Sequence, residues 1–173
     1  MKAVSTLAEN LLRATGLYSD VALKRIENGL EANPGMPLIE GVLKFGGEKE
    51  ALFLEKIGDV LGLEHVDVAN LQPRPDVIAK LPASAVYQYN AMPIRFDGSA
   101  LTVAAADPFN TAIADGLRLA AGCPVRIALA PAEEIDKAVK KFYGVGAEAV
   151  EKMLEDGRYS VDDMDGAISK IDV

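Results

Sequence analysis

Side chains that could catalyse a reaction or hold a metal ion are few in this chain and far apart in the sequence. His65 is the only histidine and Cys123 the only cysteine among the 173 residues, so neither has a second ligand of its own kind. A serine-based catalytic triad would have to use His65, and no G-x-S-x-G turn presents a serine. We therefore predict a surface or packed structural role for His65 and expect no metal site.

Motifs for phosphate binding and for carboxylate chemistry are also incomplete. The stretch GGEK at residues 46–49 lacks the spacing and the hydroxyl group of the phosphate-binding loop G-x-x-x-x-G-K-[ST]. The carboxylate pairs at residues 133–134 and 162–163 are adjacent in sequence, so they diverge rather than converge on a substrate. We predict no catalytic and no cofactor-binding residue, and an enzyme of unrelated chemistry that uses Asp107 or His65 is the weakest hypothesis.

The composition favours an acidic globular protein. Half of the residues are apolar and the formal net charge is −8, so the chain can bury a core but lacks the basic excess that attracts nucleic acid or an anionic membrane. No apolar run approaches the roughly 20 residues of a membrane span, and the first residues lack the pattern of a secretory leader. We expect a cytoplasmic protein that binds no nucleic acid, does not insert into a membrane, and reaches one only through a protein partner.

A repeat of 31 residues occupies the first third of the chain, and its spacing positions apolar residues on helix faces. The matching pairs are Leu7 with Leu38, Leu11 with Val42, Leu12 with Leu43, Gly16 with Gly47, Leu23 with Leu54, Ile26 with Ile57 and Leu30 with Leu61. Each copy predicts a helix hairpin, with Gly16 or Gly47 as the left-handed residue that ends its first helix. The two hairpins should pack as one four-helix unit over residues 3–62, within a first subdomain of residues 1–70. We expect Val4, Leu7 and Leu11 to be core residues rather than partner-facing ones.

The second part of the chain, residues 71–143, alternates between strand and helix patterns after a proline-rich boundary at residues 72–75. Asp97-Gly98 between apolar runs predicts a two-residue hairpin turn. The expected elements are helices at 76–81 and 83–87, strands at 92–96 and 100–105, a helix at 108–121, a strand at 124–129 and a helix at 132–142. The order from the first strand is β-β-α-β-α, a small mixed sheet backed by helices, so the predicted fold class is α+β.

The stretch VAAADPFN at residues 103–110 raises one further question of chemistry, because strand ends are where α/β enzymes carry functional groups. We predict that Asp107 instead caps the helix at 108–121 and that Pro108 takes the first helical position, where a missing amide proton costs nothing. Residues 144–173 are looser and acidic. We expect a hinge at residues 144–146, a short helix at 147–154, and a linker leading to an ATPase core that this chain lacks.

These features together resemble a known family. After the two helix-hairpin repeats come LGLEHVDV, then LPASAVYQYNAMPIRFDGSALTVAAADPFN, then GLRLAAGCPVRIALAPAEEIDKAVKKFYG. This order resembles the N-terminal domain of the assembly ATPases of type II secretion systems and type IV pili, over about residues 5–155. The run LP…A…PI…G..LTVA..DP and the closing A..EEI..A+..FYG are the most specific parts.

The resemblance implies a non-catalytic docking and regulatory role. In such ATPases the nucleotide-binding core lies C-terminal to this domain, so ATP and magnesium are expected only in that core, and a hexamer only in the full-length protein. In the secretion branch the domain binds the cytoplasmic domain of an inner-membrane platform protein, which implies a cytoplasmic location peripheral to the inner membrane. The sequence does not decide between a type II secretion system and a type IV pilus machine.

A subset of this family binds cyclic di-GMP through the repeat, and here the motif is altered. In that subset each copy opens with Arg-Leu-Gly and closes with Gln. The first copy here opens with Thr6-Leu7-Ala8 and closes at Leu30, and the second opens with Pro37-Leu38-Ile39 and closes near Val60-Leu61. Because arginine would pair a phosphate or stack on a guanine, its loss leaves cyclic di-GMP sensing as the alternative reading rather than the preferred one.

Overall fold

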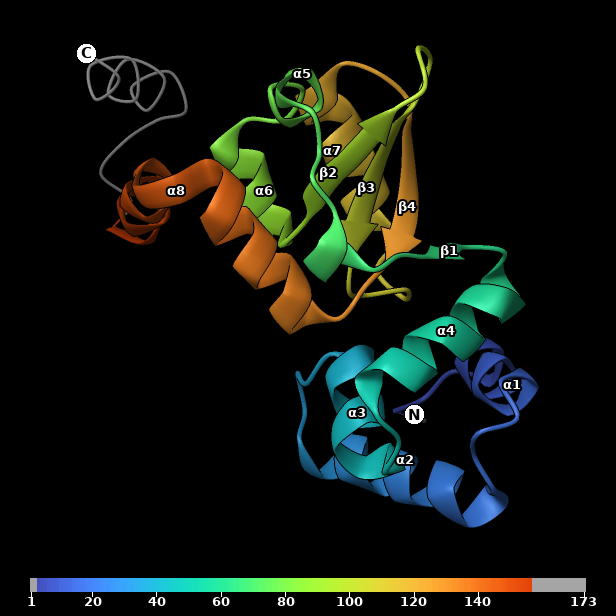
Figure 1. Ribbon diagram of the computed structural model, residues 1–173. Helices are drawn as coiled ribbons and strands as arrows, with labels where there is room; N and C mark the ends of the chain where they lie inside the picture. The colour runs from blue at the N-terminus through green and yellow to red at the C-terminus, as the bar shows by residue number, and fades with distance from the viewer. Residues whose placement is uncertain (1–2, 157–173) are drawn as a thin grey trace.

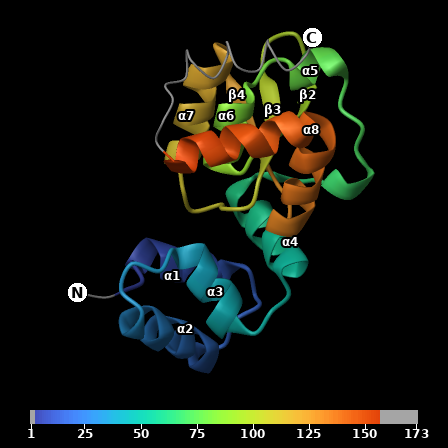
Figure 2. The same cartoon turned by 90° about the vertical axis from the view of Figure 1, so that its left-hand side faces the viewer.

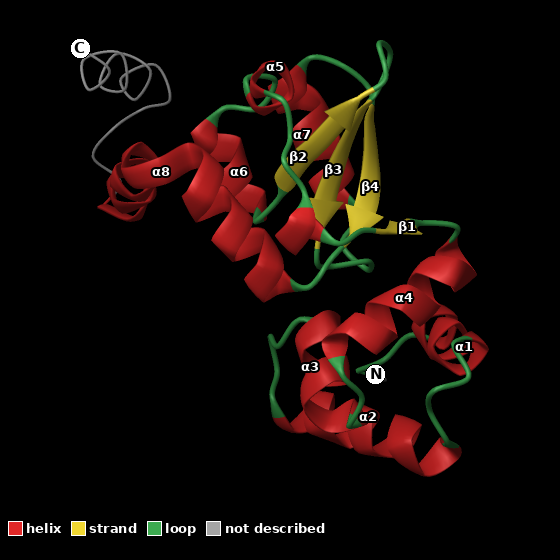
Figure 3. Cartoon of the chain, viewed as in Figure 1, coloured by secondary structure: helices red, strands yellow, loops and turns green. Residues whose placement is uncertain are grey.

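The computed structural model describes residues 3–156, which form two parts joined at one side (Figure 1). Four helices make up the first part, called here the hairpin subdomain (residues 3–62). The second part, the sheet subdomain (residues 63–143), holds the strands together with the remaining helices (Figure 3). The predicted α+β class is confirmed.

The helices of the hairpin subdomain follow the sequence repeat closely. They are α1 (Thr6–Ala14), α2 (Asp20–Ala32), α3 (Leu38–Gly46) and α4 (Glu50–Leu61). The hydroxyl groups of Ser5 and Ser19 accept hydrogen bonds from the third amide of α1 and of α2, each at 3.2 Å, and so cap these helices. Gly16 and Gly47 take φ angles of +73° and +86°, the left-handed conformation that ends a helix.

The closest helix pairs in this subdomain join one copy of the repeat to the other, α2 with α3 and α1 with α4. Ile26 of the first copy and Ile57 of the second are both completely buried in the shared core. The sequence led us to expect Leu7 in this core as well, but it is 70% exposed. Val4, which precedes α1, is buried as expected, and Leu11 is half-buried against the same core, whereas the core side of α1 is formed by Ala8 and Leu12.

Two glycines allow α2 and α3 to approach closely. A Cβ atom on Gly29 of α2 would lie 2.3 Å from the Phe45 ring, and one on Gly41 of α3 would lie 2.3 Å from a Leu30 methyl group. Each helix thus contributes one glycine and one large side chain, and the large side chain of one helix packs over the glycine of the other. The spacing of the two helices depends on these positions having no side chain.

The sheet subdomain contains a four-stranded sheet in the order β1-β4-β3-β2. Its strands are β1 (Glu64–His65), β2 (Met92–Phe96), β3 (Leu101–Ala105) and β4 (Val125–Leu129). The β2–β3 pair is antiparallel, whereas β3–β4 and β4–β1 are parallel. Residues 64–65 join the sheet as an edge strand, which no pattern in the sequence predicted, and lead into the 3-10 turn η1 (Val68–Asn70).

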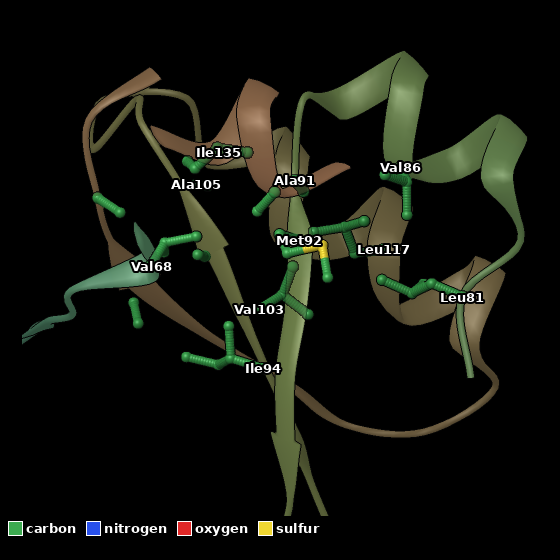
Figure 4. Packing of buried hydrophobic residues seen from close by; sticks show 14 of the residues in the cluster. Val68, Leu81, Val86, Ala91, Met92, Ile94, Val103, Ala105, Leu117 and Ile135 are labelled. Atoms are coloured by element: carbon green, nitrogen blue, oxygen red, sulfur yellow. The ribbon is translucent and has the colours of Figure 1, made fainter. Parts of the chain in front are cut away.

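Helices cover both faces of this sheet. Helix α7 (Ala112–Ala121) lies on one face, whereas η1 and the first half of α8 (Ala132–Asp156) lie on the other (Figures 1 and 2). The short helices α5 (Pro75–Ile78) and α6 (Ala83–Tyr89) pack near β2 and beside α8. Figure 4 shows side chains from the strands and from α6, α7 and α8 meeting in this core, Val86, Leu117 and Ile135 among them.

The two subdomains are joined by buried side chains and by backbone hydrogen bonds. Leu129, at the end of β4, is completely buried and belongs to the core of the hairpin subdomain, although its neighbours Ala128 and Ala130 belong to the sheet core. Phe109 also packs against the helical core, with its ring centroid 6.1 Å from that of Phe53. The carboxylate of Glu50 accepts the amide of Ala132 at 3.3 Å, which links the starts of α4 and α8.

Helix α8 continues beyond the helix that we predicted at 132–142. Gly144 interrupts it with φ 62° and ψ −157°, at the predicted hinge, and the expected helix at 147–154 lies within α8. Just before the interruption, the Tyr143 hydroxyl lies 3.0 Å from the carbonyl oxygen of Ile78 and 3.2 Å from that of Leu81, which fixes the end of the first half of α8. The rest of the predicted linker, residues 157–173, lies outside the described residues.

Among residues 3–156, none of the helices combines the length and the apolar character needed to cross a lipid bilayer.

Leu129→Ala tests the junction between the subdomains. We expect the free energy of unfolding to fall by about 2–5 kcal/mol, because the substitution leaves a cavity where the two cores meet. The matched control is Leu119→Ala, at a leucine of α7 that is 85% exposed, which should change the free energy of unfolding by less than about 0.5 kcal/mol. Urea unfolding followed by circular dichroism measures both. Equal losses in the two variants would contradict the role given to Leu129.

Candidate functional site

Asp107 lies in a loop at the end of β3 and does not cap a helix. Its Oδ1 accepts the amide of Phe109 at 2.9 Å, which closes a local turn, and α7 begins only at Ala112. Pro108 therefore lies in the loop, not in the first turn of the helix. The predicted cap is wrong because residues 107–111 form a non-helical loop, in which the half-buried Phe109 packs against the helical core.

The turn between β2 and β3 is shifted by one residue from the prediction. Asp97 and Ala100 form the last backbone hydrogen bond, at 3.2 Å, so Gly98 and Ser99 are the central residues, and Gly98 has φ +97°. The carboxylate of Asp97 accepts the amides of Ala100 and Ser99, each at 2.8 Å, and the Ser99 hydroxyl at 2.9 Å. These hydrogen bonds hold the pKa of the Asp97 carboxyl well below its usual range. The bond from the amide of Ala100 is the largest cause, followed by the bonds from the amide and the hydroxyl group of Ser99.

The residues singled out as possible nucleophiles or ligands lie apart. His65 is exposed in β1, and Cys123 is half-buried after the end of α7. Within residues 3–144, whose side chains the structure describes, no group of three or more histidine, cysteine or acidic side chains is close enough to hold a metal ion. None of these residues is brought close to Asp107 by a hydrogen bond or an ion pair.

The openings of the two repeat copies fall in corresponding places, at the first turns of α1 and α3. Arg13 and Arg25 are the two arginines of the hairpin subdomain, and both already bind internal acceptors. Arg13 pairs with Glu9, at 3.1 Å, and with Asp20. Arg25 donates to the carbonyl oxygens of Phe45 and Gly46 at 2.6 and 3.1 Å, where it caps the end of α3. Both guanidinium groups would therefore have to give up acceptors within the chain in order to bind a phosphate.

An apolar pocket of about 200 Å³ lies between the start of α7 and the outer side of β4. Its apolar walls come from four elements: Leu63 before β1, Ala105 of β3, Ile113 and Ala114 of α7, and Ile127 of β4. Asp107, Pro108, Asn110 and Thr111 complete the lining, and Asp107 is the one charged residue among them. Sequence reasoning missed this site because it depends on how β1 and the 107–111 loop are placed, which no local pattern shows.

Comparisons with known sequences identify related proteins. The model of the MshEN domain matches residues 61–149. Type II secretion system protein E of Xanthomonas campestris pv. campestris is 29% identical over 157 residues, which cover 88% of this chain and 27% of that protein. Type IV pilus assembly ATPase PilB of Myxococcus xanthus is 23% identical over 150 residues, which cover 87% of this chain and 26% of that protein. The chain spans about a quarter of the length of these curated relatives.

Two solved structures share the fold. The structure of MshE with cdg has a TM-score of 0.68 and 21% identity, with 78% of this chain and 96% of that chain covered. The N-terminal domain of XpsE has a TM-score of 0.64 and 27% identity, with 83% of this chain and 98% of that chain covered. At 21% identity the first likeness shows the fold alone.

Asp97→Asn tests the hydrogen bonds at the β2–β3 turn. Because the folded chain holds the pKa of Asp97 below its unfolded value of about 3.9, the ionised carboxylate stabilises the folded state above about pH 4. This contribution is lost as the pH falls further, so the stability difference between the natural chain and the variant should shrink below about pH 4.

The measurement is thermal unfolding across a pH series, with Asp59→Asn on the exposed side of α4 as the control that removes a charge without removing a turn. A difference that stayed constant down to the lowest pH, or one equal to that of the control, would show that the turn does not depend on the Asp97 charge.

Proposed function

Since this chain belongs to the MshEN domain family, we propose that it is a non-catalytic docking and regulatory domain of a type II secretion ATPase. In this proposal the domain recruits the motor to the inner membrane by binding the cytoplasmic domain of a platform protein. ATP and magnesium would be bound by the C-terminal ATPase core of the full-length protein, where a hexamer would also form.

The observation that carries the proposal is the relation to type II secretion system protein E, which extends over both subdomains. The match covers 88% of this chain but 27% of that protein, so the activity of the rest of the protein is not represented in these residues. The docking role given to this domain is the one that the resemblance to secretion ATPases implies.

The geometry is suited to docking because the two subdomains are held together by buried contacts. Leu129 and Phe109 place side chains of the sheet subdomain in the helical core. The hydrogen bond between Glu50 and the start of α8 adds a polar link at the same junction. A partner that binds either subdomain would therefore meet a preformed surface and would pay little entropy to order it.

Isothermal titration against the cytoplasmic domain of the cognate platform protein tests the docking proposal. We expect saturable binding with a Kd of about 10 μM or tighter. An acidic protein of similar size and net charge is the control for non-specific attraction. Absence of binding by a sample that circular dichroism shows to be folded would refute the proposal. The same titration against the corresponding domain of a type IV pilus machine decides between the two kinds of machine.

The second candidate function is cyclic di-GMP sensing, the alternative that the sequence also offered. The observation in its favour is the similarity in fold to the structure of MshE with cdg. Two facts oppose it. The copies open with Thr6-Leu7-Ala8 and Pro37-Leu38-Ile39 rather than with arginine and glycine. Arg13 and Arg25, the arginines nearby in the sequence, already form ion pairs or hydrogen bonds with acceptors within the chain.

Titration with cyclic di-GMP separates the two candidates. We expect no saturable binding up to about 100 μM ligand, since Arg13 and Arg25, the arginines of the hairpin subdomain, already bind acceptors within the chain. Intrinsic tyrosine fluorescence and calorimetry on the same sample provide two independent measurements. Micromolar affinity would overturn the docking-only reading and would show that this chain binds the dinucleotide through groups other than arginine.

A further inference from the structure

A groove of about 300 Å³ lies between η1 and the first half of α8, on the side of the sheet subdomain away from α7. Its floor is apolar. Val68 and Ala138 are buried there, and Leu71 and Phe142 are half-buried. Beyond Gly144 the second half of α8 turns away from η1 (Figures 1 and 2). The half-buried apolar side chains of the floor therefore face a groove that is open along the first half of α8.

The residues that α8 contributes to this groove follow helical spacing. They occupy positions i, i+3, i+4, i+7 and i+8, which share one face of a helix, and are Glu134, Lys137, Ala138, Lys141 and Phe142. The groove therefore follows the helix for about two turns, roughly 12 Å at a rise of about 1.5 Å per residue. A second helix lying along this groove would present its own side chains to the floor at the same spacing.

Two lysines stand one helical turn apart on the rim of the groove. Lys137 pairs with Glu133 at 2.8 Å. Lys141 has Lys137 rather than an acidic residue four positions before it, and its recorded contact among the described side chains is with the Phe142 ring, whose centroid lies 5.3 Å from Nζ. Like charges at this spacing destabilise a helix slightly. A carboxylate bound between the two ammonium groups would remove that repulsion.

The charges on the rim differ between the two ends of the groove. Glu134 lies towards the start of α8, whereas Lys137 and Lys141 lie towards Gly144. The complementary surface therefore carries its acidic group at the Lys141 end and has no acidic group opposite Glu134. Apolar floor and rim charges together specify the kind of segment that fits and the direction of its charge.

We propose that this groove binds an amphipathic helix of a partner protein, one whose apolar stripe is flanked by acidic residues. One large apolar side chain of that helix lies over Ala138, between Leu71 and Phe142. A carboxylate of the same helix pairs with Lys137 and Lys141. A helix that lays its apolar face into a groove in this way is anchored by residues three and four positions apart.

This inference goes beyond the docking proposal, which assigns no surface of the chain, and it does not depend on it. The probe is a synthetic peptide of about 14 residues with leucine and alanine on one helical face and glutamate beside it. It is titrated to about 1 mM into the isotopically labelled chain at about 0.15 M salt and followed by NMR. We expect amide shifts at Ala69, Ala138 and Lys141. Absence of shifts, or shifts on the hairpin subdomain instead, overturns the proposal.

Two pairs of variants isolate the charge and the apolar floor. Lys141→Glu reverses the charge on the rim, whereas Lys140→Glu makes the same change at the adjoining exposed position, outside the groove lining. Ala69→Leu fills the groove from its exposed η1 side, whereas Ala120→Leu makes the same change on an exposed part of α7. We expect the first member of each pair to weaken peptide binding by about fivefold or more and the second to leave it within about twofold. Equal effects within either pair would overturn the proposal.

Two further ligands separate a helix from other acidic surfaces. A peptide of the same composition in scrambled order, in which the leucines no longer share a face, should bind at least about fivefold more weakly, and equal binding would contradict the helical occupant. Vesicles that contain phosphatidylglycerol test an anionic lipid surface. Shifts at Lys137 and Lys141 with these vesicles but not with the peptide would assign the two lysines to a membrane and would overturn the proposal.

Discussion

The burial of Leu129 in the helical core, between two residues that belong to the sheet core, is the contact that fixes how the two parts of the domain meet. It lies at the end of β4, so the strand must reach the helical core before α8 can begin. The bond between Glu50 and the first amide of α8 lies at the same place. The pairing of His65 of β1 with Leu129 and the start of α8 lie at this same stretch of chain.

Phe109 shows how such a contact overrides a local signal. Asp107-Pro108 has the sequence of a helix start, and an isolated peptide would favour that structure. In the structure the Phe109 ring packs against Phe53, the four residues 108–111 lie outside the helix, and the side chains of Asp107 and Asn110 accept the amides of Phe109 and Ala112. The Asp-Pro stretch, which seemed a candidate for chemistry, is part of the connection between the subdomains.

The sequence predicted best where the pattern is repeated and local. The 31-residue repeat predicted four helices because both copies place leucine and isoleucine at helical spacing. Apolar runs beside turn residues predicted strands at 92–96 and 124–129, which the structure has at 92–96 and 125–129. It predicted less well where distant contacts decide. A two-residue strand such as β1 has no pattern of its own, and its pairing with β4 depends on α4. Nor could helical spacing alone separate Leu7, which is exposed, from Val4, which is buried, since both were expected in the core.

The reciprocal packing of α2 on α3 has a consequence for how this domain can change over evolutionary time. Gly29 and Leu30 belong to the first copy of the repeat, whereas Phe45 and Gly41, against which they pack, belong to the second. A duplicated segment usually gives each copy freedom to diverge. Here a mutation that enlarges a glycine in one copy must be answered by a smaller residue in the other, so the two copies drift as a pair and not as independent sequences.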